Sequence, residues 1–499
     1  MSENKKQTYL EREKDWRNGA IVYQVIVDRF APAINIESKR HQYDYPKVLK
    51  NWSETPKPGQ YDPNTRYHTH ELEYWGGDLN SLYSRLDYIK SLGVDVLYLN
   101  PIVKSLSNHK YDASDYMEIS PEYGTKEELK RLTDTLHQSG RKLILDGVFN
   151  HVGINSDLFQ NAKDSKNPKH KWFDFNDKYP EGVRLWADVR SLPELNLENP
   201  EVQEYIYKGN DSVIKSYLRN GIDGWRLDVA FDIGYEYLKG ITDSAHEEKP
   251  GSVIIGEIWN YPQKWLKSID GVMNFTFREI IIRVLKGDIS PNQANLFFNN
   301  VIESAGIESI LKSWNLLDNH DVPRLKNLFK EQNDRKLAQV LQFTLPGSPN
   351  LYYGTELGMD GANDPMNRAP MRWDMLSESN PELVWTKKLV NMHKNERALK
   401  VGDYIPILSD KLIGFERKTD RVNDTVIVLI NPTDKVVSDT ILMPDSDLMS
   451  YTKFEYLLGN PVDTHFVAGF LNITLEPKSF IVVKPLTKVL KSYTAYKRI

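Results

Sequence analysis

The sequence contains no cysteine. A disulfide framework, a thiol nucleophile and a cysteine-ligated zinc site are therefore excluded. Long hydrophobic runs are also missing, since no apolar stretch reaches the roughly 18 residues that a membrane span needs. Residues 1–15 are almost wholly polar, unlike a secretory signal. We therefore expect no membrane partner and a cytoplasmic location.

An excess of positive charge is absent as well. The chain has 64 Lys and Arg against 69 Asp and Glu, a net charge of −5 at pH 7, and no long basic block. Because nucleic-acid phosphates attract clustered basic residues, we expect no nucleic-acid partner. The 499 residues do include 40% hydrophobic and 11% aromatic residues. That composition is sufficient for a large buried core in a chain of several domains.

Short apolar segments alternate with helical patterns over most of the chain. Helix signals include a candidate N-cap at Asp78, a capping box formed by Thr125 and Glu128, and Asn199-Pro200 at another helix start. This alternation predicts an α/β protein, most simply a (β/α)8 barrel, with a doubly wound open sheet as the second interpretation. The eight predicted strands are residues 21–27, 94–99, 142–147, 222–228, 253–257, 271–275, 314–317 and 350–353.

Two regions depart from the regular repeat. The interval between the third and fourth strands is far longer than one crossover helix needs, so we expect an inserted lobe after strand 3. Beyond residue 402, short β-rich segments separated by Asn, Asp and Pro replace the helical pattern. The predicted barrel consists of two parts, residues 1–151 and 199–401. Residues 152–198 are predicted to form the inserted domain between them, and residues 402–499 to form an antiparallel β-sandwich domain.

Acidic residues follow several of the predicted strands. Arg226 and Asp228 alternate along one strand and therefore share a face. Glu257 ends the next strand and Asp321 follows a strand two units later. A single such acid is most simply a helix N-cap or a solvated loop residue. Three of them at the carboxyl ends of barrel strands, where barrel active sites lie, favour a retaining glycosidase with paired carboxylates.

Four stretches carry a resemblance that covers nearly the whole chain. Residues 146–151, 224–230, 256–259 and 319–321 occur in the order of the matching motifs of the α-amylase family, glycoside hydrolase family 13. The sequence resembles this family. Residues 107–112 and 192–196 favour its neopullulanase and cyclomaltodextrinase branch.

The resemblance implies a role for each matching residue. Asp228 corresponds to the nucleophile, which needs a low pKa, and Glu257 to the general acid, which needs a raised one. Asp321 corresponds to the third acid, which holds sugar hydroxyls. The remaining matches are expected to contact substrate: the hydrogen-bond donors His109, His151 and His320, the stacking platform Tyr111, Arg226 beside the nucleophile, and the pair Asp364 and Arg368 at the neighbouring sugar.

The resemblance requires no cofactor and leaves a calcium site at Asn150 open, because calcium needs six or more oxygen ligands. Residues 31–35 lack the Asn, Gly and Asp cluster of another calcium site in the family, so we expect that site to be absent. Relatives often dimerise through an amino-terminal β domain, whereas the barrel here begins near residue 16. The oligomeric state therefore stays open.

The expected substrates are α-1,4-linked maltooligosaccharides, cyclodextrins and related α-glucans. Val229, directly after the nucleophile position, resembles family members that also accept α-1,6 linkages. Phe231-Asp232 replaces an Asn-Glu pair common in the branch, which leaves specificity on the acceptor side open. Transglycosylation or phosphorolysis on the same site is the alternative reaction, and a non-catalytic glucan-binding relative is the alternative class.

Overall fold

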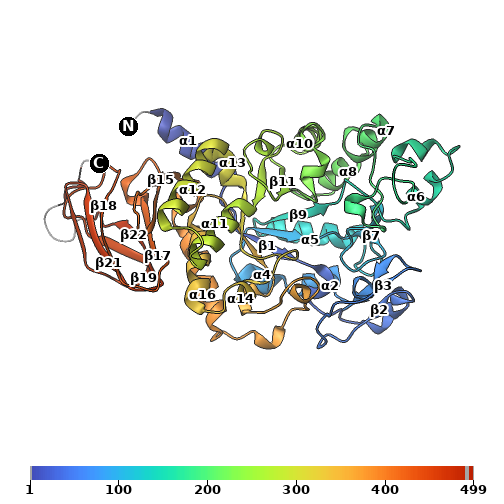
Figure 1. Cartoon of the computed structure of the whole chain (residues 1–499), viewed down its shortest axis with the longest axis horizontal. Helices are drawn as coiled ribbons and strands as arrows, with labels where there is room; N and C mark the ends of the chain where they lie inside the picture. Colours follow the sequence, from blue (N-terminus) through green and yellow to red (C-terminus); the bar gives the residue numbers. More distant parts are fainter. Residues whose placement is uncertain (1–2, 489–493, 498–499) are drawn as a thin grey trace.

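A closed barrel of parallel strands forms the centre of the computed structural model, which describes residues 3–488 and 494–497 (Figure 1). The first barrel strand pairs with both the second and the last, which closes the sheet. The predicted (β/α)8 barrel is confirmed, and the open-sheet alternative is wrong. Its strands are β1 (Val22–Val25), β6 (Val96–Leu99), β9 (Lys142–Gly147), β10 (Gly224–Leu227), β11 (Val253–Ile258), β12 (Gly271–Asn274), β13 (Trp314–Leu316) and β14 (Ser348–Tyr352).

The register of β9, β10 and β11 brings polar residues together at one end of the barrel. Arg226 on β10 lies opposite Asp146 on β9 and Ile255 on β11. Asp228 and Glu257 therefore stand beside each other near the carboxyl ends of adjacent strands. Apolar side chains, including Ile144 and Trp314, fill the barrel interior below them.

Helices surround the barrel, as Figure 1 shows. The capping box formed by Thr125 and Glu128 is present at the start of α5. Among the described residues, no helix combines the length and apolar character needed to cross a bilayer. The longer helices are α5 (Lys126–Gln138), α10 (Tyr235–Glu248), α11 (Phe275–Lys286), α12 (Pro291–Ala305), α15 (Gln332–Thr344) and α16 (Pro381–Asn395).

Two helical segments that begin at predicted start signals are interrupted in the structure. After the confirmed N-cap at Asp78, the helix breaks at Arg85, whose guanidinium lies 4.2 Å from the centre of the Trp373 ring. Asn199 caps a helix as expected, but the chain becomes extended at Gly209 before a new helix begins. The four pieces are α3 (Leu79–Ser84), α4 (Leu86–Ser91), α7 (Pro200–Gln203) and α8 (Val213–Arg219).

Excursions from the barrel rim carry residues of the predicted site. A hairpin of β7 (Val103–Ser105) and β8 (Ala113–Ile119) follows β6, and its turn carries His109 and Tyr111. The segment between β9 and α7 contains α6 (Asp157–Ala162), and Figure 1 shows it at the side of the barrel farthest from the C-terminal strands.

Two antiparallel sheets form the C-terminal part of the chain. Side chains between them, such as Ile427 and Phe466, make a separate apolar core. One sheet has the order β15 (Asp403–Pro406), β16 (Ile413–Lys418), β17 (Val426–Asn431), β22 (Ser479–Pro485) and β19 (Phe454–Gly459); the other has the order β18 (Val437–Leu442), β21 (Phe470–Leu475) and β20 (Thr464–Val467).

Asn295 on α12 joins the barrel helices to the C-terminal strands. Its amide nitrogen donates to the carbonyl oxygens of Ser409 and Leu412 at 3.4 and 3.0 Å. Its amide oxygen accepts from the backbone N–H of Gly414 at 3.0 Å. The Asn295 side chain is buried, so these backbone groups depend on it for their hydrogen bonds.

We predict that Asn295→Ala lowers the free energy of unfolding by about 2–4 kcal/mol, because it leaves buried backbone groups unsatisfied and opens a small cavity. Denaturant titration measures the change. Asn292→Ala is the matched control, since Asn292 is exposed on the same helix. Equal stability of the two variants would contradict the assigned role of Asn295.

Candidate active site

Arg226 lies at the centre of the site and has no exposed surface. Its Nη1 lies 2.9 and 3.0 Å from the two oxygens of Asp146 and 3.2 Å from Oδ1 of Asp228. Its Nη2 lies 3.0 Å from Oε2 of Glu257. Burial disfavours the charge of Arg226, but these carboxylates outweigh it and raise the pKa of the guanidinium. One cation therefore holds carboxylates from three neighbouring strands.

Two further donors fix the carboxylate of Glu257. The backbone N–H of Val229 donates to Oε2 at 2.9 Å, and the indole N–H of Trp259 donates to Oε1 at 2.7 Å. Val229 has the left-handed values φ 38° and ψ 47°, which are rare and strained for a β-branched residue. This conformation is the one in which its N–H reaches Glu257.

The charge balance around Asp228 favours a bound proton. Burial, followed by the neighbouring Glu257, raises the pKa of Asp228 well above its ordinary value, while Arg226 opposes the rise. This direction is opposite to the low pKa expected for a nucleophile. The physical reason is that Asp146, Asp228 and Glu257 share a single guanidinium, so negative charge is in excess until one carboxyl is protonated.

A hydrogen-bonded pair of rings lies beside this cluster. The hydroxyl of Tyr111 donates to Oδ2 of Asp146 at 2.9 Å and lies 2.6 Å from Nε2 of His320. The amide of Gln24 donates to Nδ1 of His320 at 3.0 Å, which places the ring proton on Nε2. Burial lowers the pKa of His320, so this histidine is neutral. The Tyr111 and His320 rings stack with their centres 5.4 Å apart.

Asp321 contacts the same nitrogen of His320 as Tyr111 does. Its carboxylate lies 3.2 Å from Nε2 of His320 and 3.5 Å from Arg368 Nη2. Burial raises the pKa of Asp321, and Arg368 opposes the rise. Arg368 also lies 3.3 Å from Asp364 through Nη1 and donates to the backbone carbonyl of His320 at 2.9 Å. The loop after β14 is thereby tied to the third carboxylate.

The remaining two histidines border the nucleophile position and the hairpin. His151 Nε2 lies 3.1 Å from the carbonyl oxygen of Tyr111 and 4.0 Å from Oδ2 of Asp228. Burial lowers the pKa of His151 to about 3, so its ring is neutral at ordinary pH. His109 accepts the backbone N–H of Tyr111 at Nδ1, and its Nε2 lies 3.2 Å from Glu71.

These contacts join every predicted catalytic and substrate-binding residue into one network. His109 joins the network by stacking on Tyr111, with the two ring centres 5.8 Å apart. Its members are Asp228, Glu257, Asp321, His109, Tyr111, His151, Arg226, His320, Asp364 and Arg368.

Asn150 lies next to this network but does not assemble a cation site from side chains. Its carboxamide interacts with Glu194, and Glu194 is paired with Arg184 at 2.6 Å. Across residues 3–488 and 494–497, no group of three or more His, Cys, Asp or Glu side chains is placed to hold a metal. The side chains of Asn150 and Glu194 alone therefore do not supply the six or more oxygens that calcium needs. Calcium binding there stays a prediction from the resemblance.

Aromatic side chains line the approach to the carboxylates. Trp186 stacks on His151 with ring centres 5.4 Å apart, and its indole N–H donates to Asp232 at 2.8 Å. Trp259 is 47% exposed and stacks on Phe275 at 3.8 Å. Such flat faces suit the apolar sides of sugar rings.

Sequence reasoning did not assign several of the residues that build the site. Asp146 opens one of the matched stretches, which is a signal that could have identified it. Gln24 belongs to none of the matched motifs. Trp186 and Asp232 are in contact although they lie 46 positions apart in the sequence, so no local spacing indicates their contact. The left-handed Val229 also lacks a local sequence signal, since valine favours extended backbone.

The barrel, with two acids side by side at neighbouring strand ends, places the protein in the class of glycoside hydrolases. Comparison with known families agrees with this class. Residues 24–398 match the model of the alpha-amylase catalytic domain. The chain belongs to the alpha-amylase family.

Relatives of this chain are found in several bacteria. It is 34% identical to a cyclomaltodextrinase of Geobacillus thermopakistaniensis, over 84% of this chain and 70% of the relative. It is 31% identical to neopullulanase 2 of Thermoactinomyces vulgaris, over 93% of this chain and 77% of the relative.

Among solved structures, the cyclic alpha-maltosyl-(1→6)-maltose hydrolase of Arthrobacter globiformis has a TM-score of 0.78 at 26% identity, over 95% of this chain and 99% of that one. The Nostoc punctiforme debranching enzyme has a TM-score of 0.79 at 28% identity, over 94% and 99%.

We predict that Asp228→Asn raises the melting temperature by a few degrees at pH 7. The raised pKa of Asp228 means that the folded protein binds this proton more tightly than the unfolded chain does. Stability is therefore lost as the pH rises from about 4, the ordinary aspartate pKa, through the folded pKa. The gain should vanish near about pH 3, below the ordinary aspartate pKa, where the wild-type carboxyl is mostly protonated in both states.

Thermal melts at both pH values check this expectation. Asp211→Asn is the control, because the Asp211 side chain is almost fully exposed and should change the melting temperature little at either pH. A lower melting temperature for Asp228→Asn at pH 7 would show that the carboxylate stabilises the fold instead.

Proposed function

We propose that the protein is a retaining glycosidase that cleaves α-1,4-glucosidic bonds in maltooligosaccharides, cyclodextrins and related α-glucans, and that it also accepts α-1,6 bonds. Asp228 is the nucleophile and Glu257 is the general acid and base. The observation that supports this assignment is the contact of the two carboxylates with neighbouring nitrogens of Arg226. Retaining chemistry needs two carboxyl groups close together on one bond, about 5–5.5 Å apart.

In the first step, an oxygen of Asp228 attacks the anomeric carbon of the bound glucosyl unit. The bond from that carbon to the leaving oxygen breaks, and Glu257 gives its proton to the leaving oxygen. In the second step, Glu257 takes a proton from water, and the water oxygen displaces Asp228. Hydrolysis is complete when both carboxyl groups have returned to their starting states.

The first step requires the proton of the carboxylate cluster on Glu257 and the negative charge on Asp228. Once Glu257 has released that proton, the N–H of Val229, the indole of Trp259 and the guanidinium of Arg226 face the new carboxylate. These donors are in place before the reaction, so they stabilise the developing charge without rearrangement. Asp321 holds sugar hydroxyls beside the reacting carbon.

The substrate class is supported by the names of relatives and by the walls of the site. The relatives include cyclomaltodextrinases, a neopullulanase and an intracellular maltogenic amylase of Bacillus subtilis. Two structural neighbours are named for a cyclic glucan containing a (1→6) bond and for debranching. The exposed faces of Trp259 and Phe231 suit stacking of glucose rings. The relative named intracellular also supports the proposed cytoplasmic location.

We predict that Asp228→Asn and Glu257→Gln each lower the hydrolysis rate of maltotriose by about a thousandfold or more, because each removes a bond-forming or proton-transfer group. The two roles separate with α-maltotriosyl fluoride, whose leaving group needs little proton donation. Glu257→Gln should still release fluoride in a burst, whereas Asp228→Asn should not. Near-wild-type rates for either variant on maltotriose would reject the assignment.

We predict that the first product formed from maltotriose is the α-anomer, because two displacements at one carbon restore its configuration. Proton NMR in the first minutes of reaction measures it. The same method follows panose, which gives maltose and glucose when its α-1,6 bond is cut but isomaltose and glucose when its α-1,4 bond is cut, so formation of maltose is the readout. An initial β-anomer would exclude the double displacement. Cleavage of maltotriose with an intact α-1,6 bond in panose would restrict the enzyme to α-1,4 linkages.

A further inference from the structure

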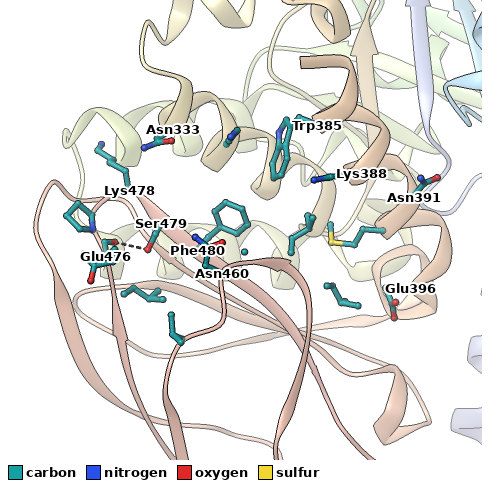
Figure 2. Close-up of a pocket in the computed structure, with 18 of the residues that line it drawn as sticks. Asn333, Trp385, Lys388, Asn391, Glu396, Asn460, Glu476, Lys478, Ser479 and Phe480 are labelled. Atoms are coloured by element: carbon teal, nitrogen blue, oxygen red, sulfur yellow. Dashed lines mark hydrogen bonds between the residues drawn. The ribbon is translucent and has the colours of Figure 1, made fainter. Parts of the chain in front are cut away.

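A groove of about 890 Å³ lies between two barrel helices and the C-terminal strands (Figure 2). Its walls come from α15 and α16 on one side and from the ends of β19, β21 and β22 on the other. None of the catalytic or substrate-contacting residues named above lines it. The groove is therefore a separate feature of the outer wall of the barrel.

Two aromatic rings face the groove from opposite walls. Figure 2 shows Trp385 on the helical side and Phe480 on the strand side, with ring centres 6.0 Å apart and planes at 59°. The indole N–H of Trp385 donates to the side chain of Gln339 at 3.1 Å, which fixes the orientation of the ring. Both rings are half-buried. Each wall thus offers a preorganised, partly exposed apolar face.

Four exposed asparagine side chains line the same groove. In the part of the chain that the structure describes, none of these four amide groups is hydrogen-bonded to another protein group. An amide offers two donors and an acceptor with two lone pairs, which matches the mixed character of sugar hydroxyls. The four residues are Asn333, Asn391, Asn395 and Asn460.

Charges on the groove are mostly paired or balanced. Lys478 is paired with Asp334 at 2.9 Å, and Glu396 with Lys484 at 3.2 Å. Lys336 extends over the Trp385 ring at 5.5 Å, and the rim also includes Lys388 and Glu476. The groove therefore has no strong field of one sign and suits an uncharged ligand.

The sequence of α16 explains why one helix serves both the barrel and the groove. Trp385, Lys388 and Asn391 are spaced by three residues and share a face. Leu389 and His393 lie on the adjoining stripe of the helix and are buried. Because a barrel helix starts near the mouth end of the preceding strand, Trp385 lies toward the mouth end of α16.

We propose that this groove is a second binding site for an α-glucan segment, which stacks on Trp385 and Phe480 and bonds through its hydroxyls to the asparagine amides. A glucose ring has apolar C–H faces and a hydroxyl rim without net charge, and the groove matches both. The choice of an α-glucan rests on the proposed function of the barrel site. A long chain bound here is held on the enzyme while another segment of it enters the barrel mouth.

Calorimetric titration with maltoheptaose tests the proposal. The parent protein carries Asp228→Asn, so the ligand stays intact, and two binding sites per chain are expected. Adding Trp385→Ala should leave one site, whereas the control Tyr451→Ala should leave two, because Tyr451 is an exposed aromatic residue outside the groove.

If Trp385→Ala fails to fold, the double variant Asn391→Ala with Asn460→Ala replaces it. This variant should weaken the second site about tenfold, since it removes hydrogen bonds to the ligand.

The outcomes separate the two proposals. One site in the parent protein, or two unchanged sites in the Trp385→Ala variant, overturns the groove assignment even if maltotriose is hydrolysed. If Trp385→Ala removes one site but the protein with an intact Asp228 cleaves no α-glucan, the groove assignment stands and the proposed function is rejected. In the catalytically intact protein, Trp385→Ala should lower kcat/KM for amylose several-fold and leave maltotriose unchanged. Displacement of maltoheptaose from the groove by glucose 1-phosphate, but not by maltose, would identify an anionic ligand and overturn the assignment.

Discussion

Arg226 is a fully buried guanidinium that contacts carboxylates from three neighbouring barrel strands. A buried charge of this kind is strongly destabilising unless its partners satisfy it with good geometry. Asp146 lies against Nη1 with both oxygens, and the guanidinium also fixes Asp228 and Glu257. Replacing the arginine would leave buried carboxylates without a counter-charge. The register of three strands and the placement of Asp228 and Glu257 therefore depend on the same cation.

Asp146 extends this order to the other side chains of the site. Tyr98 and Tyr111 both donate to its Oδ2, at 2.6 and 2.9 Å. From Tyr111 the hydrogen bonds continue to His320, and contacts with Arg368 follow from there. These side chains are thus oriented without a ligand, which lowers the reorganisation that binding of a substrate requires. The arrangement also explains why burial, rather than a single ion pair, has the largest effect on the pKa of Asp228, His320 and Asp321.

The sequence is informative where a local pattern also determines the fold. Apolar strands that end in Asp228 and Glu257 predict both the barrel and the acids at its rim, because parallel strands present their carboxyl ends together. The breaks at Arg85 and Gly209 could not be predicted in the same way. The helical pattern continues through Arg85, and the break accompanies a tertiary contact with Trp373. The hydrogen bond between Trp186 and Asp232 likewise depends on how the inserted segment folds back, which no local spacing encodes.

The backbone of Val229 is strained, and this strain lowers the stability of the fold. A β-branched residue in the left-handed region is strained by about 1–3 kcal/mol, and glycine would adopt the same backbone angles freely. An engineer who screened for heat resistance would therefore favour glycine at this position. The N–H that steadies Glu257 would then belong to a more flexible peptide, free to turn away from the acid. Selection for thermal endurance and selection for turnover would choose different residues at position 229.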